Sequence, residues 1–384
     1  MPKRFLRPRN GISANVSFSE LFFDLIYVFA VTQLSHYLLH HLTLIGTLQT
    51  LILWFAAWLA WQYTAWVTNW FDPDTRKIRL LLFFLMLSSL IFAAGIPDAF
   101  EGRGLVFALA YITIQVGRTV FVLLLLDRDE PLKKNFQRIL GWLVISAIFW
   151  LAGGLTYDNT RLVLWTIAVL CEYVSPMLGF RLPLLGKSVS HEEWKIEGHH
   201  LAERCQLFVI VALGESILTT GATLSELDVW GPPTIIAALI SFTGSLAMWW
   251  IYFDNSSKAG SHAITNTDNP GLMGSYFHYI HVILIGAIII CAVANELVIG
   301  HPDQRIKAIT ATVLLSGPVV YILANAIYKR LVYGRYPLSH LVGIFGFILL
   351  IPIMFLTDLL MVNTLETIIL IAIATWDSCS CIKN

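Results

Sequence analysis

A series of long apolar segments constrains what this chain can fold into, because each is close to the length that a helix needs to cross a lipid bilayer. A membrane-spanning helix takes about 20 apolar residues. Of the 384 residues, 57% are hydrophobic and only 13% are charged, about half the charged share of a soluble domain. We therefore expect an all-α integral membrane protein with about twelve transmembrane helices. The predicted spans are 18–41, 44–70, 79–97, 104–126, 139–156, 161–180, 201–222, 232–253, 274–299, 307–328, 338–357 and 362–376.

The distribution of lysine and arginine tests this assignment, since the cytoplasmic loops of membrane proteins carry an excess of both. If the N-terminal segment lies in the cytoplasm, 20 of the 25 basic residues fall on the cytoplasmic side and four on the outer side. Arg118 is the remaining one, inside the fourth predicted span. This asymmetry predicts twelve spans with both termini in the cytoplasm.

The longest polar connection lies near the middle of the chain and leaves six predicted spans on either side. Each half therefore has the same orientation in the membrane. The predicted parts are a cytoplasmic N-terminal segment (1–17), a first six-helix half (18–180), a central cytoplasmic loop (181–200), a second six-helix half (201–376) and a cytoplasmic tail (377–384).

Polar residues recur in the two halves at a nearly constant distance in the sequence. Glu203 follows Glu20 by 183 positions, and Glu215 follows Gln33 by 182. The second and eighth spans end in Phe-Asp pairs, at Asp72 and at a second aspartate 182 positions later, Asp254. The offset predicts two parallel repeats, an architecture of carriers whose substrate site lies near the midplane between the halves.

Three stretches resemble a known family. VSFSELFFDLIYVFAVTQLSHYL at 16–38, ERCQLFVIVALGESIL at 203–218 and YFHYIHVILIGAIIICAVANELVIGHP at 276–302 are similar to segments of the bacterial low-temperature-requirement A (LtrA) proteins. The resemblance implies a multi-pass protein of the bacterial cytoplasmic membrane that is linked by name to growth in the cold. It implies no particular substrate.

Two acidic residues at the start of the first span need an explanation, because ionisable groups inside a bilayer are costly. Ser17 and Glu20 have the spacing of a capping box, in which Ser17 caps the helix and Glu20 bonds back to the cap. Asp24 lies one turn deeper, where no cap explains it. It is either a functional carboxylate or a member of a structural ion pair.

Asp24, Arg118 and Glu172 belong to three different spans and fall at about the same predicted depth. We expect Arg118 to pair with Asp24 or Glu172, which would leave one carboxylate able to take a proton or cation. A purely structural triad is the alternative. Glu203, at the start of the seventh span, is expected to be structural, like Ser17 and Glu20.

Glu215 is the foremost candidate for ion coupling. It lies about 20 Å along its predicted helix, among small and hydroxyl side chains that suit close helix contact, including Gly221. Gln33 would be its uncharged counterpart in the first half. The alternative is a protonated Glu215 that bonds to a neighbouring helix.

The remaining polar candidates lie near the ends of spans. Asp72 and Asp254 end their spans at the predicted cytoplasmic face. They are either gate residues or solvated side chains that pair with nearby basic residues. His36 begins an HxxxHH pattern found in di-iron membrane enzymes. His278 and His281 lie near the opposite surface, so the predicted topology separates these histidines and disfavours a shared metal site.

These features favour a secondary transporter driven by a proton or cation gradient and carrying an unidentified small solute. The chain has no phosphate-binding GxxxxGK[ST] loop. It has zero net charge, which gives no reason to expect a nucleic-acid partner. We expect membrane lipids as partners, no cofactor, no metal and no enzymatic activity. The alternatives are a sensor or lipid-tuning factor for cold growth and, less favoured, a metal-dependent membrane enzyme.

Overall fold

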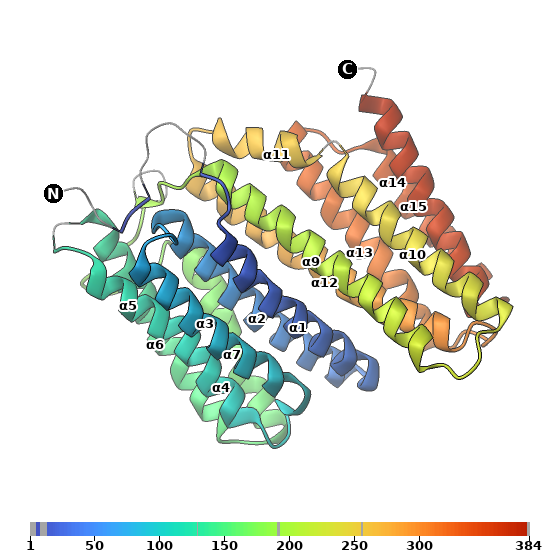
Figure 1. Ribbon diagram of the computed structural model, residues 1–384, viewed down its shortest axis with the longest axis horizontal. Helices are drawn as coiled ribbons and strands as arrows, with labels where there is room; N and C mark the ends of the chain where they lie inside the picture. The colour runs from blue at the N-terminus through green and yellow to red at the C-terminus, as the bar shows by residue number, and fades with distance from the viewer. Residues whose placement is uncertain (1–4, 8–13, 129, 190–192, 255, 382–384) are drawn as a thin grey trace. The chain divides into compact units, whose positions relative to one another are not determined.

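The computed structural model describes residues 5–7, 14–128, 130–189, 193–254 and 256–381, and within these ranges its regular secondary structure is helical, with three isolated β-bridges besides. Parts of the predicted N-terminal segment, central loop and tail lie outside the described residues. Figure 1 shows the helices in chain order.

The helices follow one another along the chain, and the longest connection joins α7 to α9. They are α1 (Phe18–His40), α2 (Leu44–Trp70), α3 (Arg76–Gly95), the 3₁₀ turn η1 (Ile96–Asp98), α4 (Gly104–Ile112), the π-helical turn η2 (Thr113–Gly117), α5 (Arg118–Leu125), α6 (Pro131–Gly154), α7 (Asp158–Met177), α9 (Gly198–Glu226), α10 (Pro232–Phe253), α11 (Ser256–Thr265), α12 (Pro270–Gly300), α13 (Ala308–Tyr333), α14 (Leu338–Met354) and α15 (Leu359–Cys381).

Ten helical stretches in the described part of the chain are long and apolar enough to cross a membrane. They coincide with ten of the predicted spans, and the α4–η2–α5 stretch counts as one of them. The other two predicted spans are also helical, but α14 is short and α7 carries three charged side chains in twenty residues. A multi-pass membrane protein is therefore confirmed, and the number twelve remains a prediction.

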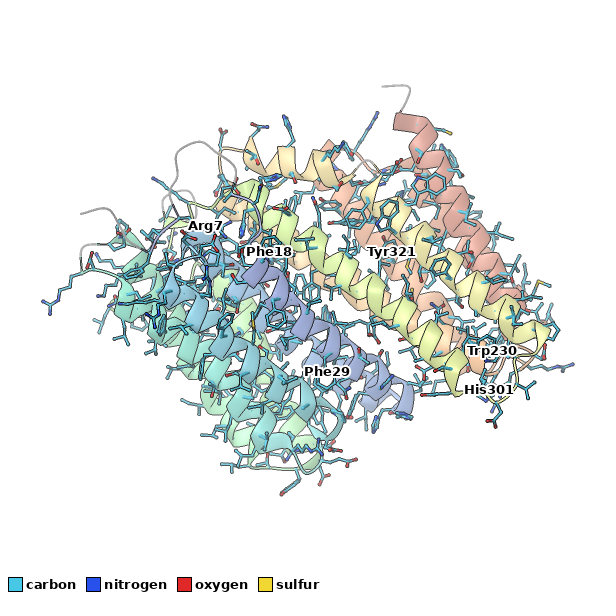
Figure 2. The ribbon with its side chains drawn as sticks, in the orientation of Figure 1. Arg7, Phe18, Phe29, Trp230, His301 and Tyr321 are labelled. Carbon is cyan, nitrogen blue, oxygen red and sulfur yellow. The ribbon has the colours of Figure 1, made fainter. Side chains whose placement is uncertain are left out.

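Helix α1 shows why the chain suits a lipid environment. Over residues 18–29 its outward side chains are apolar: Phe18 is 91% exposed and Leu25 57% exposed, and Phe29 lies on the same stripe (Figure 2). Its acidic residues face the opposite way, since Glu20 and Asp24 are almost completely buried. Apolar groups outside and charges inside reverse the pattern of a soluble protein, as burial in lipid requires.

The chain forms two compact units. Unit 1 comprises residues 1–204 and 264–275, and unit 2 comprises residues 205–263 and 276–384. In unit 1, α1 packs against α2 and α3, α4 packs against α3 and α6, and α6 packs against α7. In unit 2, α15 packs against α10 and α14, and α13 packs against α14.

Glycines at the end of α6 allow the close packing of unit 1. A Cβ atom on Gly153 would lie 2.4 Å from the Trp165 ring, and one on Gly154 would lie 3.1 Å from the backbone of Leu105 in α4. Trp165 is completely buried and donates its indole N–H to the Trp150 carbonyl at 3.1 Å. The two glycines therefore set the contact of α6 with both α4 and α7.

Candidate functional site

The N-terminus of α1 is closed by the predicted capping box. The Ser17 hydroxyl accepts from the Glu20 backbone N–H, and the Glu20 carboxylate accepts from the Ser17 backbone N–H at 2.9 Å. Glu203 also contributes here, because its carboxylate accepts from the Val16 backbone N–H at 3.2 Å. These residues order the chain as it enters the first span.

Glu20 also belongs to a buried charge cluster. Its carboxylate pairs with the Arg7 guanidinium at 3.0 Å and lies 3.0 Å from Nε2 of His200. A second guanidinium, that of Arg204, approaches to 3.7 Å. The side chains of Glu20, His200 and Arg204 are completely buried, so the cluster is shielded from solvent.

Asp24 joins this cluster through one of its two oxygens. Oδ1 accepts from Nη2 of Arg204 and from the indole N–H of Trp61, both at 2.7 Å. Oδ2 has no hydrogen-bond partner among the described residues. The cationic partner of Asp24 is therefore Arg204, which lies near the start of α9.

Glu172, on α7, is held by a complete set of neutral donors. Oε2 accepts from the Tyr111 hydroxyl at 2.5 Å and from the Gln115 amide at 3.0 Å. Oε1 accepts from the Trp150 indole at 2.9 Å and from the Ser146 hydroxyl. Four donors leave this carboxylate little capacity to bind another group.

Arg118 is completely buried and forms no ion pair within the described residues. Its Nη1 donates to the Thr64 hydroxyl at 3.1 Å and to the Ala60 carbonyl at 3.3 Å, and its Nη2 donates to the side-chain oxygen of Gln115. Gln115 thus stands between Arg118 and Glu172. The predicted direct pair is wrong, because Asp24 pairs with Arg204 and Glu172 accepts from neutral donors instead.

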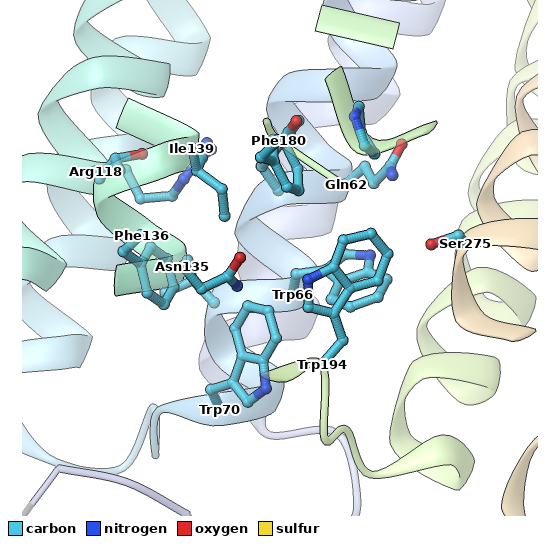
Figure 3. Close-up of a pocket in the computed structure, with 14 residues that line it drawn as sticks. Gln62, Trp66, Trp70, Arg118, Asn135, Phe136, Ile139, Phe180, Trp194 and Ser275 are labelled. Atoms are coloured by element: carbon cyan, nitrogen blue, oxygen red, sulfur yellow. The ribbon is translucent and has the colours of Figure 1, made fainter. Parts of the chain in front are cut away.

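Arg118 lies at the edge of a cavity in unit 1 that has a volume of about 40 Å³. The other wall is aromatic: Figure 3 shows Arg118 and Asn135 on one side and the rings of Trp66 and Trp194 on the other. The six aromatic residues of the lining are Tyr63, Trp66, Trp70, Phe136, Phe180 and Trp194. Of the three charged residues predicted to share one depth, Arg118 therefore lies in the lining of a cavity.

In unit 2, polar side chains from three helices meet around the residue after Glu215. Ser216 on α9 hydrogen-bonds to Ser245 on α10 at 2.9 Å and accepts from the Asn295 amide of α12 at 3.1 Å. Glu215 itself is buried and accepts from the Thr219 hydroxyl at 3.0 Å. The small-residue contact expected at Gly221 is absent, since a Cβ there would meet nothing within 4 Å.

Other predicted candidates lie apart from these clusters. Gln33 is half-buried and His36 exposed, both on α1. Asp72 accepts from the Asp74 backbone N–H at 2.9 Å, and Asp254 accepts from the Ser378 hydroxyl at 2.5 Å. The described residues contain no group of three or more side chains arranged to hold a metal ion.

The sequence assignment missed three residues that the structure places inside the helical core. His200 fell in the predicted central loop and Arg204 was counted among the cytoplasmic basic residues, although both are buried in the first two turns of α9. Glu366 lies in the middle of α15, is only 3% exposed, and its Oε1 has no hydrogen-bond partner among the described residues. Because Glu366 is an acidic residue inside the predicted span 362–376, the sequence alone could have identified it as a candidate.

Comparison with known proteins gives two matches over nearly the whole chain. The model of the bacterial low temperature requirement A protein (LtrA) family matches residues 15–375. An uncharacterized protein of Rhizobium meliloti (strain 1021) is 37% identical over 376 residues, which cover 97% of this chain and 91% of that protein. No solved structure matches. The resemblance seen in the three sequence stretches is therefore confirmed.

Proposed function

We propose that this chain, which belongs to the bacterial low temperature requirement A (LtrA) family, is a secondary transporter that couples movement of a small solute to a proton or cation gradient. In this proposal the protein lies in the bacterial cytoplasmic membrane with twelve spans and both termini in the cytoplasm. It uses no cofactor and catalyses no reaction.

Glu366 is the observation that carries the proposal. A carboxylate buried away from water costs several kcal/mol unless it is paired or neutralised. No Lys, Arg or His of the described chain lies within ion-pair distance of Glu366, and one of its oxygens lacks a hydrogen bond. A proton or a bound cation is what such a group requires, and exchange of that ion is what coupling requires.

The surroundings of Glu366 in unit 2 support the same reading. One turn earlier on α15, the Asn363 amide donates to the Ser241 hydroxyl of α10 at 3.0 Å. Ser245, one turn along α10, continues to Ser216 on α9 through the bond described above. Hydroxyl and amide groups therefore extend from the helix of Glu366 to that of Glu215, and such groups can pass protons or contact a cation.

A binding screen at two pH values tests the proposal. The purified protein and its Glu366→Gln and Glu215→Gln variants are heated with metabolites, ions and lipids, and the shift in unfolding temperature is measured. A ligand present at a hundredfold excess over its Kd stabilises the folded state by about 2.7 kcal/mol. We expect a solute whose stabilising effect depends on pH in the wild type and loses that dependence in Glu366→Gln.

Glu226→Gln provides the matched control, because it makes the same chemical change at an exposed position of unit 2. It should behave as the wild type does. Stabilisation by lipids alone, equal in all four proteins, would contradict transport and favour a factor that tunes the membrane in the cold.

A further inference from the structure

Three residues that line the unit 1 cavity each have a buried N–H group with no hydrogen-bond acceptor among the described residues. These groups are Nε of Arg118, Nδ2 of Asn135 and Nε1 of Trp194. Arg118 and Asn135 are completely buried, and Trp194 is 6% exposed. Buried donors are almost always paired in proteins, so three orphans around one cavity indicate that an acceptor belongs there.

The orientation of the Asn135 amide follows from its neighbours. Arg138 donates to the Ser188 hydroxyl oxygen at 3.2 Å, and that hydroxyl donates to Oδ1 of Asn135 at 2.7 Å. With the Arg138 guanidinium as a donor to its oxygen, the Ser188 hydroxyl has its own hydrogen left to give to Asn135. The amide oxygen of Asn135 is therefore occupied, and its NH₂ group remains for the cavity.

Two tryptophans of the cavity lining differ in whether their indole N–H has an acceptor. Trp70 also lines the cavity, but its indole N–H donates to the Lys195 carbonyl at 2.7 Å. The neighbouring Trp194 has no such acceptor, although its ring packs edge-on against Trp66 and Phe180 at centroid distances of 6.1 and 5.9 Å. Packing holds the Trp194 ring in place while its donor stays available.

We infer that this cavity binds a short-chain organic carboxylate. The head of such a ligand offers only acceptors, which matches three donors and the fixed positive charge of Arg118. Its apolar remainder fits the aromatic wall. A cavity of about 40 Å³ has room for roughly three or four water molecules, and therefore for a ligand of the size of acetate or propionate.

Two other ligand classes fit less well. An organic cation would suit the aromatic rings, but the guanidinium of Arg118 lies at the cavity edge without a described acidic partner and would repel it. Phosphate carries more charge and is costlier to move from water into an aromatic-walled space. The carboxylate is the class that satisfies both the donors and the walls.

Calorimetric titration of the purified protein tests this inference with sodium acetate, sodium propionate, sodium phosphate and tetramethylammonium chloride. We expect saturable binding of acetate and propionate and none of the other two. Trp194→Phe keeps the ring and removes the donor, and should weaken binding about tenfold or more. Asn135→Asp keeps the shape, replaces the donor with a negative charge, and should abolish binding.

Trp142→Phe is the matched control, because Trp142 belongs to unit 1 but donates to the Arg181 carbonyl outside the cavity. Its affinity should equal that of the wild type. Absence of saturable carboxylate binding would mean that water alone fills the cavity, and would overturn the inference. Equal affinity in Trp194→Phe, in a folded protein, would overturn it too. The measurement does not depend on transport, so it stands or fails separately from the proposed function.

Discussion

Arg204 holds two buried acidic residues at once. It donates to Asp24 at 2.7 Å and lies 3.7 Å from Glu20, with its own side chain completely buried. Removing one partner of a buried ion pair leaves an uncompensated charge, which costs far more than the pair contributes. The stability of unit 1 should therefore be very sensitive to this position.

Replacing Arg204 by Met keeps the volume of the side chain and removes its charge. We expect the free energy of unfolding to fall by about 3–5 kcal/mol, because Asp24 and Glu20 lose a shared cation. Equilibrium denaturation of the purified protein measures the change. Arg76→Met, at an exposed position, should cost little. Similar stability of the two variants would show that the acids are neutral in the folded protein.

At the scale of the helix, unit 1 depends on close contact at the end of α6. Gly153 and Gly154 carry no Cβ, and that space is taken by the Trp165 ring and by the backbone at the start of α4. A side chain at either position must push a buried neighbour, and packed interiors give way only at a cost. The glycines are thus required by packing and not by an unusual backbone conformation.

Gly153→Ala should destabilise the protein by about 1–3 kcal/mol, since the new methyl group overlaps the Trp165 ring. It should also disturb the hydrogen bond from Trp165 to Trp150, which near-ultraviolet circular dichroism would report. Gly221→Ala is the control: its Cβ has open space, and alanine favours helix by up to about 1 kcal/mol. A destabilised Gly221→Ala with an unaffected Gly153→Ala would reverse the packing argument.

For the whole molecule, the predicted topology assigns each connection between helices to one side of the membrane. The asymmetry of basic residues predicts that the 181–200 loop lies in the cytoplasm and that the connection around Arg103 lies outside. Fusions of alkaline phosphatase and of green fluorescent protein after Lys187 and after Arg103 measure this. We expect the fusions after Lys187 to be fluorescent and to lack phosphatase activity. The fusions after Arg103 should show phosphatase activity and no fluorescence. The same reporter active at both sites would mean that the number of spans between them is even.

Some residues of the candidate sites could be predicted from the sequence, and the partners of others could not. The box of Ser17 and Glu20 was predictable, because a cap depends on neighbours three residues apart. Asp24, Glu172 and Glu215 were recognised as unusual for the same local reason, since acids stand out in apolar runs. The partner of Asp24 was predicted wrongly: Arg118 was nearer in predicted depth, but Arg204 belongs to a helix 180 positions away.

The helical fold and its ten apolar stretches followed from the sequence alone, because lipid forces every spanning segment to satisfy its backbone within one helix, and length and hydropathy are local properties. The two-repeat architecture remains a prediction from spacing. Only the tertiary structure decided which buried groups meet: that four neutral donors surround Glu172, that no cation of the described chain pairs with Glu366, and that three residues lining one cavity each have an N–H group without a described acceptor. Such pairings depend on the rotation and depth of helices far apart in the chain, and apolar periodicity does not encode either closely enough.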